Sequence, residues 1–110
     1  MDSLGLLRTA ASGMEAQRAA LDVAARNVAA AEAAGPKGSY ERFLPQFRVI
    51  DNDDTPEVEF TGAEPQRGSS VDILTEMVSV LNASRAYEAN ASIFDIGKQL
   101  AQRTIDMGRL

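Results

Sequence analysis

The chain has 110 residues, a formal net charge of −5, no cysteine and no histidine. Disulfide bonds and thiolate chemistry are therefore excluded, as are catalytic arrangements that use a histidine base. Lysine and arginine form no cluster of the kind that binds nucleic acid, and no apolar run approaches the roughly 20 residues that span a bilayer. The first residues lack the basic region and apolar core of a secretory signal, so we expect no cleaved signal peptide.

Residues 3–34 are predicted to form the first helix, with Ser3 as its cap. Twelve alanines between residues 10 and 34 favour a helix by intrinsic propensity, and Gly35-Pro36 is typical of a helix stop. Apolar residues and smaller companions repeat at seven-residue intervals along it: Leu7, Met14, Leu21 and Val28, with Ala10, Gln17, Ala24 and Ala31. This narrow seam lets another helix approach closely.

The middle of the chain, residues 36–70, differs in kind because it contains all four prolines. Residues 43–50 and 57–61 alternate or are β-branched and aromatic, which predicts two short strands joined by an acidic turn. A calcium loop is an alternative interpretation of the acidic residues. Pro56 stands where such a loop requires glycine, so a solvated turn is the prediction.

Residues 71–110 are predicted to form a second long helix, which Asp72 caps. One row of mostly apolar residues repeats at seven-residue intervals: Ile73, Val80, Tyr87, Phe94 and Ala101. A companion row lies four residues after each of these: Met77, Ser84, Ala91, Lys98 and Ile105. A second apolar set lies elsewhere around the helix: Leu74, Val78, Ile93, Ile96, Leu100 and Met107. A helix that is apolar on two sides needs partners on two sides, and we expect one of them to be another chain.

The predicted fold is therefore mainly α. Two long N- and C-terminal helices pack as an antiparallel coiled-coil pair, with a small β-hairpin or loop excursion between them. The parts are residues 1–35 for the N-terminal helix, 36–70 for the excursion and 71–110 for the C-terminal helix. Gly5 and Gly13 weaken the first turns, so we expect the terminal segments to order fully only when neighbours cover them.

Both ends of the chain carry motifs that resemble one family. The N-terminal motif is Ser12-Gly13-Met14-Glu15-Ala16-Gln17, followed by Leu21-Asp22-Val23-Ala24-Ala25-Arg26-Asn27-Val28-Ala29. The C-terminal motif is Glu76-Met77-Val78 with Ala83-Ser84-Arg85-Ala86-Tyr87 and Ala89-Asn90. Together they resemble the signatures of bacterial flagellar rod and hook proteins, and the short chain is most similar to the proximal-rod members. Ala30 departs from that pattern, which has a second asparagine there.

The resemblance implies a structural protein without enzymatic activity or cofactor. Such proteins pass through the flagellar export apparatus without signal cleavage and assemble in the periplasm with other rod proteins and with copies of themselves. Their terminal helices pack around a central channel, and the rod joins the membrane ring to the hook. A soluble coiled-coil adaptor that binds one partner helix is the alternative function.

On this interpretation the seam residues and several polar positions on the two helices form the subunit interface. Polar groups such as Gln17, Asn27, Arg85 and Asn90 would fix the alignment of neighbouring helices. The predicted interface residues are Leu7, Met14, Gln17, Leu21, Asn27, Val28, Met77, Leu81, Arg85, Tyr87, Asn90 and Phe94. We predict no catalytic, metal-binding or cofactor-binding residue.

Overall fold

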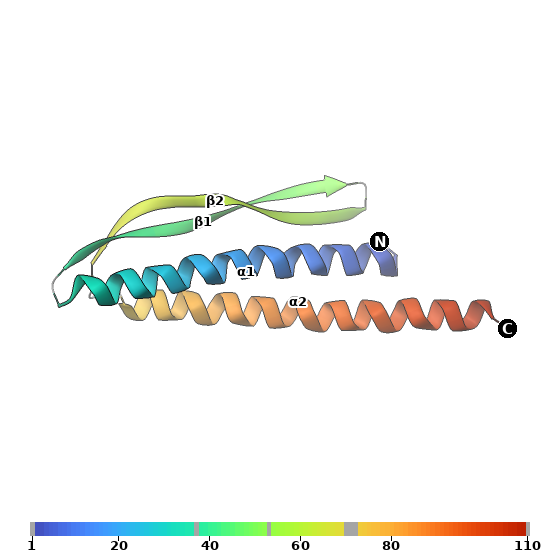
Figure 1. Cartoon of the computed structure of the whole chain (residues 1–110). Helices are drawn as coiled ribbons and strands as arrows, with labels where there is room; N and C mark the ends of the chain where they lie inside the picture. Colours follow the sequence, from blue (N-terminus) through green and yellow to red (C-terminus); the bar gives the residue numbers. More distant parts are fainter. Residues whose placement is uncertain (1, 37, 53, 70–72, 110) are drawn as a thin grey trace.

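The computed structural model describes residues 2–36, 38–52, 54–69 and 73–109. The elements follow one another as α1 (Ser3–Ala34), β1 (Ser39–Asn52), β2 (Thr55–Ser69) and α2 (Ile73–Gly108). The molecule is a slender rod of 67 × 22 × 13 Å. Figure 1 shows α1 in the middle, with the hairpin along one side of it and α2 along the other. The prediction of two long helices with an antiparallel hairpin between them is confirmed.

The caps of α1 explain its limits. Asp2 caps the helix, because its Oδ1 accepts a hydrogen bond of 2.7 Å from the Gly5 N–H, so the prediction that Ser3 is the cap was wrong by one residue. The helix ends at Gly35, whose φ of +71° suits glycine, as its sequence predicts. The predicted cap of the second helix, Asp72, lies outside the described residues.

The two helices run in opposite directions and meet through small side chains (Figure 1). A Cβ atom built on Gly13 would lie 2.6 Å from Asn90 Oδ1, and one on Gly97 would lie 3.0 Å from Leu7 Cδ2. These two contacts fix the register of the pair. The buried residues of α1 are Gly5, Ala10, Gly13, Ala16, Ala20, Ala24, Asn27 and Ala31, and those of α2 are Glu76, Ala83 and Gly97.

The companion row predicted for α2 is wrong by one position. Met77 and Ile105 are 48% and 51% exposed, whereas Glu76, Ala83 and Gly97, each three residues after a member of the first row, are buried. Small residues allow the helix axes to come close, so α2 turns this row toward α1 and leaves the larger side chains outside. The buried apolar core is mostly alanine, and each buried methyl contributes only about 0.8 kcal/mol.

The strands are longer than the sequence predicts, because three prolines fit within them. Phe43 pairs with Pro65, Pro45 with Ala63, and Asp51 with Pro56. At such positions the backbone groups point away from the partner strand, so a missing N–H removes no bond between the strands. One extra residue, Thr61, interrupts the register beside Gly62, whose φ is +137°.

The hairpin twists along its length, so that different strands face α1 at its two ends. Near the base, Phe43 of β1 bonds to α1 through Asn27. Near the tip, Val58 of β2 bonds to α1 through Ser12. Figure 1 shows the two strands crossing between these points, as the strong twist of a two-stranded ribbon allows.

Candidate assembly surfaces

A buried ion pair fixes the start of α2 to the base of the hairpin. Glu76, in the first turn of α2, is fully buried, and its Oε1 lies 2.6 Å from Arg42 Nη2. Arg42 Nε donates to both carboxylate oxygens at 3.1 and 3.2 Å, and the Tyr40 hydroxyl donates to Oε2 at 3.2 Å. A buried carboxylate is tolerated only when such bonds compensate for its lost water. These three residues, the Glu76 clasp, tie together segments far apart in the sequence.

Sequence reasoning missed this clasp. It placed Glu76 in the C-terminal motif and gave Arg42 and Tyr40 no role. A signal was nevertheless present, since Glu76 shares its heptad position with Ala83, Asn90 and Gly97. A carboxylate at a packed position needs a cationic partner, and Tyr40 and Arg42 lie on one face of a strand because they are two residues apart.

Two further contacts fasten the hairpin to α1. The Asn27 amide is 3% exposed and bonds to both the N–H and the C=O of Phe43, each at 2.8 Å. Thr9 Oγ1 donates to the Pro56 carbonyl at 2.7 Å, and the Val58 N–H donates to Ser12 Oγ at 3.1 Å. The hairpin is thus fixed to α1 near both of its ends.

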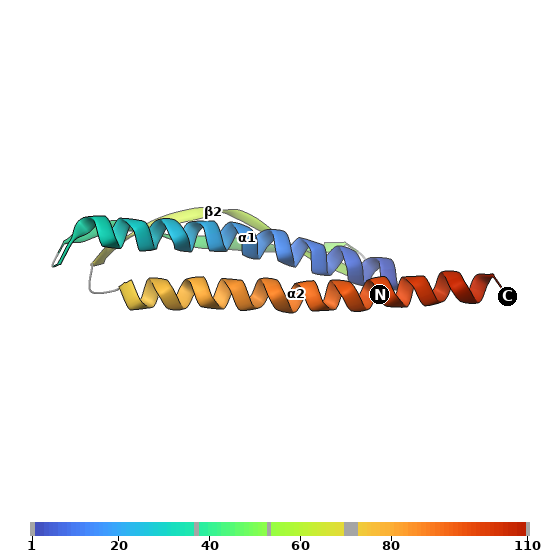
Figure 2. The ribbon, with the colours of Figure 1, turned by 60° about the horizontal axis from the view of Figure 1, so that its bottom comes forward.

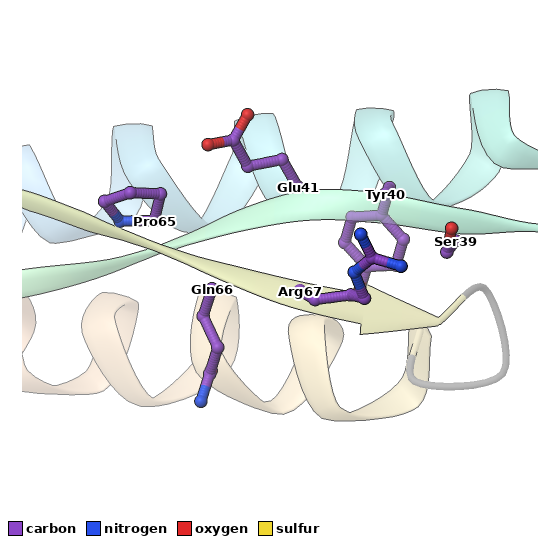
Figure 3. A pocket seen from close by; sticks show the side chains of 6 residues that line it. All are labelled: Ser39, Tyr40, Glu41, Pro65, Gln66 and Arg67. Atoms are coloured by element: carbon purple, nitrogen blue, oxygen red, sulfur yellow. The ribbon is translucent and has the colours of Figure 1, made fainter.

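The surface hollows that the described residues line are open to solvent. One of about 380 Å³ lies at the base of the hairpin, where Figure 3 shows the Glu41 and Gln66 side chains pointing to opposite sides. Among the described residues, no group of acidic side chains could hold a metal ion. In the same part of the chain, neither helix combines the length and hydropathy of a bilayer-spanning segment.

Two grooves flank α1 and contain five of the predicted interface residues. A groove of about 490 Å³ is lined by Met14, Tyr87 and Phe94 together with Arg8 and Arg18. A second, of about 330 Å³, lies between α1, β1 and α2. Its lining includes the predicted Gln17 and Asn27, with Phe43, Phe47 and Asn82.

The remaining predicted interface residues have different surroundings. Leu7 packs against Gly97, and the Asn90 side chain lies against Gly13 while donating to the Ala86 carbonyl of its own helix. Leu21 and Val28 are half-buried on α1. Met77, Leu81 and Arg85 are exposed on α2.

Most of the large exposed apolar side chains of the described residues belong to α2. Many of them belong to the second apolar set of the sequence. The large exposed apolar residues of the helix, each at least 39% exposed, are Leu74, Met77, Val78, Leu81, Tyr87, Ile93, Ile96, Leu100, Ile105 and Met107. Exposed apolar surface of this extent is a candidate site of contact with other proteins.

The end of α2 also extends beyond α1. The contacts of Gly97 with Leu7 and of Gly13 with Asn90 place Ser3 opposite about residue 100. Residues 101–108, about 12 Å of helix, therefore have no α1 beside them. Figures 1 and 2 both show this end of α2 projecting past the N-terminus.

Sequence comparisons identify the class of protein to which this helical rod belongs. Residues 7–37 match the profile described as flagella basal body rod protein, and residues 66–107 match that of the flagellar basal body rod FlgEFG protein C-terminal. Together the two matches cover most of α1, the end of β2 and nearly all of α2. The chain belongs to the flagellar basal-body rod protein family, which confirms the resemblance found in the sequence.

The similarity to individual proteins is more specific. The chain is 27% identical to the flagellar basal-body rod protein FlgC of Aquifex aeolicus (strain VF5), over 96% of this chain and 97% of that protein. It is 28% identical to FlgC of Yersinia enterocolitica, over 99% of this chain and 100% of that protein. The chain is thus a FlgC-like structural subunit of the flagellar rod. This role involves assembly with other rod components, and it agrees with the prediction that the chain is not an enzyme.

Proposed function

We propose that this chain forms part of the proximal rod and packs with both helices in the wall around the central export channel. The observation that supports this arrangement is the apolar side of α2, where Leu74 is 72% and Met107 is 71% exposed. Neighbouring subunits, either copies of this chain or other rod proteins, would cover that side. The contact would remove apolar surface from water and so stabilise the assembly.

Assembly and folding are coupled in this proposal. The interior between α1 and α2 consists largely of alanine and glycine, so the isolated pair gains little from burial. Covering the outer side of α2 would add the larger side chains to the core, and the helix pair would then complete a coiled-coil packing with its neighbours. Met77, Leu81, Arg85 and Tyr87 would contact those neighbours, while Leu7 and Asn90 would hold α1 and α2 together.

The location follows from the same proposal. The chain would be exported without a cleaved signal peptide and would act in the periplasm, between the membrane ring and export apparatus on one side and the distal rod on the other. It would transmit torque as one segment of a continuous shaft.

A double variant tests this function. Val78 and Leu81 are 54% and 48% exposed, so Val78→Gln with Leu81→Gln should leave the isolated fold intact and remove an apolar contact. We expect loss of swimming and absence of the chain from purified basal bodies. Glu88→Gln, also at an exposed position of α2, is the matched control. This variant should still swim and should still be found in purified basal bodies. Normal basal bodies that contain the double variant would contradict the proposal and leave the adaptor alternative standing.

A further inference from the structure

The direction of the backbone groups along β1 follows from one contact. Asn27 bonds to the N–H and the C=O of Phe43, so both groups point away from β2. In an antiparallel pair such positions alternate along the strand. The Val58 N–H bonds to Ser12, so it points away from β1. The backbone groups of its partner Val49 therefore point away from β2. In the tip half of β1, the backbone groups therefore point outward at Phe47, Val49 and Asp51.

Because the hairpin twists, it has four separate stretches of strand edge, and three of them are protected. The base half of β1 is covered by Asn27 and contains Pro45. The tip half of β2 is covered by Thr9 and Ser12 of α1. The base half of β2 is exposed, but Pro65 removes an outward N–H from its centre. Covering an edge and placing proline on it are the usual ways to prevent unwanted strand pairing.

The fourth stretch, the tip half of β1, has neither protection. Within the described chain, no hydrogen bond outside the strand ladder reaches the backbone of Phe47, Val49 or Asp51. Val49 is 69% and Phe47 is 41% exposed. Figure 1 shows this end of β1 on the side of the hairpin away from α1. Arg48, the cation within this stretch of β1, is held by Glu59 at 2.7 Å. This open edge therefore offers unpaired backbone groups and two apolar side chains.

The charge beside the open edge defines what it would accept. Asp51 and Asp54 are exposed at its tip, and neither has an ion pair among the described residues. An incoming segment with lysine or arginine at that end would meet these carboxylates. A second copy of this chain fits less well, because antiparallel pairing about Val49 would place Asp51 opposite Phe47.

We propose that the open edge of β1, residues 47–51, receives a strand of another polypeptide. That strand is an extended segment of about five residues, the length that spans the open edge. Main-chain hydrogen bonds to Phe47, Val49 and Asp51 hold it, and Val49 and Phe47 contact its apolar side chains. A basic residue at one end faces Asp51 and Asp54. The hairpin thus has a partner of its own, because of the unpaired backbone groups on its edge and independently of where the chain lies in the rod.

The test uses the full-length chain labelled with nitrogen-15 and the synthetic peptide acetyl-Lys-Val-Thr-Val-Lys-amide. The expected result is a set of amide shifts that is larger at Phe47, Val49 and Asp51 than at Arg48 and Ile50, whose N–H groups bond within the hairpin. The acidic counterpart, acetyl-Glu-Val-Thr-Val-Glu-amide, should bind at least about three-fold more weakly, and the difference should shrink as salt screens the charges. Equal binding of the two peptides, or shifts without this alternation, would overturn the proposal.

Variants identify the edge. Val49→Pro removes an outward N–H without removing a ladder donor, so it should abolish binding while the helical circular dichroism remains unchanged. Val49→Thr keeps that N–H and should keep binding. Ala63→Pro removes an outward N–H from the exposed edge of β2 and should leave peptide binding unchanged. Binding by Val49→Pro would overturn the proposal, as would a dimer of the unmodified chain that Val49→Pro dissociates, because the occupant would then be a second copy.

Discussion

The side-chain amide of Asn27 pairs with the backbone of Phe43 as a neighbouring strand would, through two hydrogen bonds of 2.8 Å. A residue in the middle of a helix thereby completes the edge of a sheet. Asn27 is shielded from water, being only 3% exposed, whereas Phe43 is half-buried.

Replacing Asn27 with alanine should therefore leave two backbone groups of Phe43 without partners. A buried group that loses its bond costs about 1–3 kcal/mol, and these two bonds are partly buried, so we expect the free energy of unfolding to fall by about 1–3 kcal/mol in total. Urea denaturation followed by circular dichroism measures the loss. Asn82→Ala, at an exposed asparagine of α2, is the control. Equal losses for the two variants would refute the anchoring role of Asn27.

The Glu76 clasp predicts a strong contrast between two ion pairs. Glu76→Gln breaks a pair whose side chains are 0% and 16% exposed, and removing one partner of a buried pair costs about 3–5 kcal/mol. Glu59→Gln breaks the Arg48 pair, which is 46% and 65% exposed and should contribute less than about 1 kcal/mol. Chemical denaturation of both variants gives the comparison. A Glu76→Gln variant as stable as Glu59→Gln would show that the clasp contributes little.

The close approach of the helices at Gly13 predicts a compensating pair of substitutions. Gly13→Ala would gain up to about 1 kcal/mol in helix propensity, but its Cβ would lie 2.6 Å from Asn90 Oδ1. Since overpacking costs about 1–3 kcal/mol, we expect a net loss of stability that Asn90→Ala relieves in the double variant. Gly108→Ala, where no atom lies within 4 Å, is the control and should not destabilise the chain. Additive effects of Gly13→Ala and Asn90→Ala would contradict the predicted contact.

Hydrogen exchange should distinguish the two parts of α2. Residues 101–108 lie beyond α1, so their amides should exchange faster in the isolated chain than those of residues 83–97, which α1 covers. In assembled rods the difference should disappear if neighbours cover this end. Uniform protection along α2 in the isolated chain would argue against coupled folding and assembly.

The sequence predicts the helices and the hairpin because their signals are local. Alanine content, Gly35 at the end of α1 and the acidic turn each act within a few residues. The buried row of α2 was missed because a periodicity of large apolar residues cannot reveal packing through Ala83 and Gly97. A pattern of hydrophobicity predicts that Met77 is buried against α1. Two helices that approach closely instead bury the smaller side chains between them.

The candidate surfaces were predictable to the extent that they are apolar. The second apolar set of α2 was recognised in the sequence and remains exposed. The Glu76 clasp and the Asn27 anchor were not recognised, because each depends on a contact with the hairpin. Glu76 contacts Arg42, 34 positions away, and Asn27 contacts Phe43, 16 positions away. The open edge at Val49 depends on the twist of the ribbon, which no local signal specifies.

The projection of α2 past α1 makes the two ends of the molecule unlike. One end presents a single bare helix, and the other presents the base of the hairpin beside the end of α1 and the start of α2 (Figure 1). Subunits that joined the bare helix of one to the hairpin base of the next would all point the same way, and such a contact could repeat indefinitely. An assembly built through such a contact would take its direction from the asymmetry of one subunit.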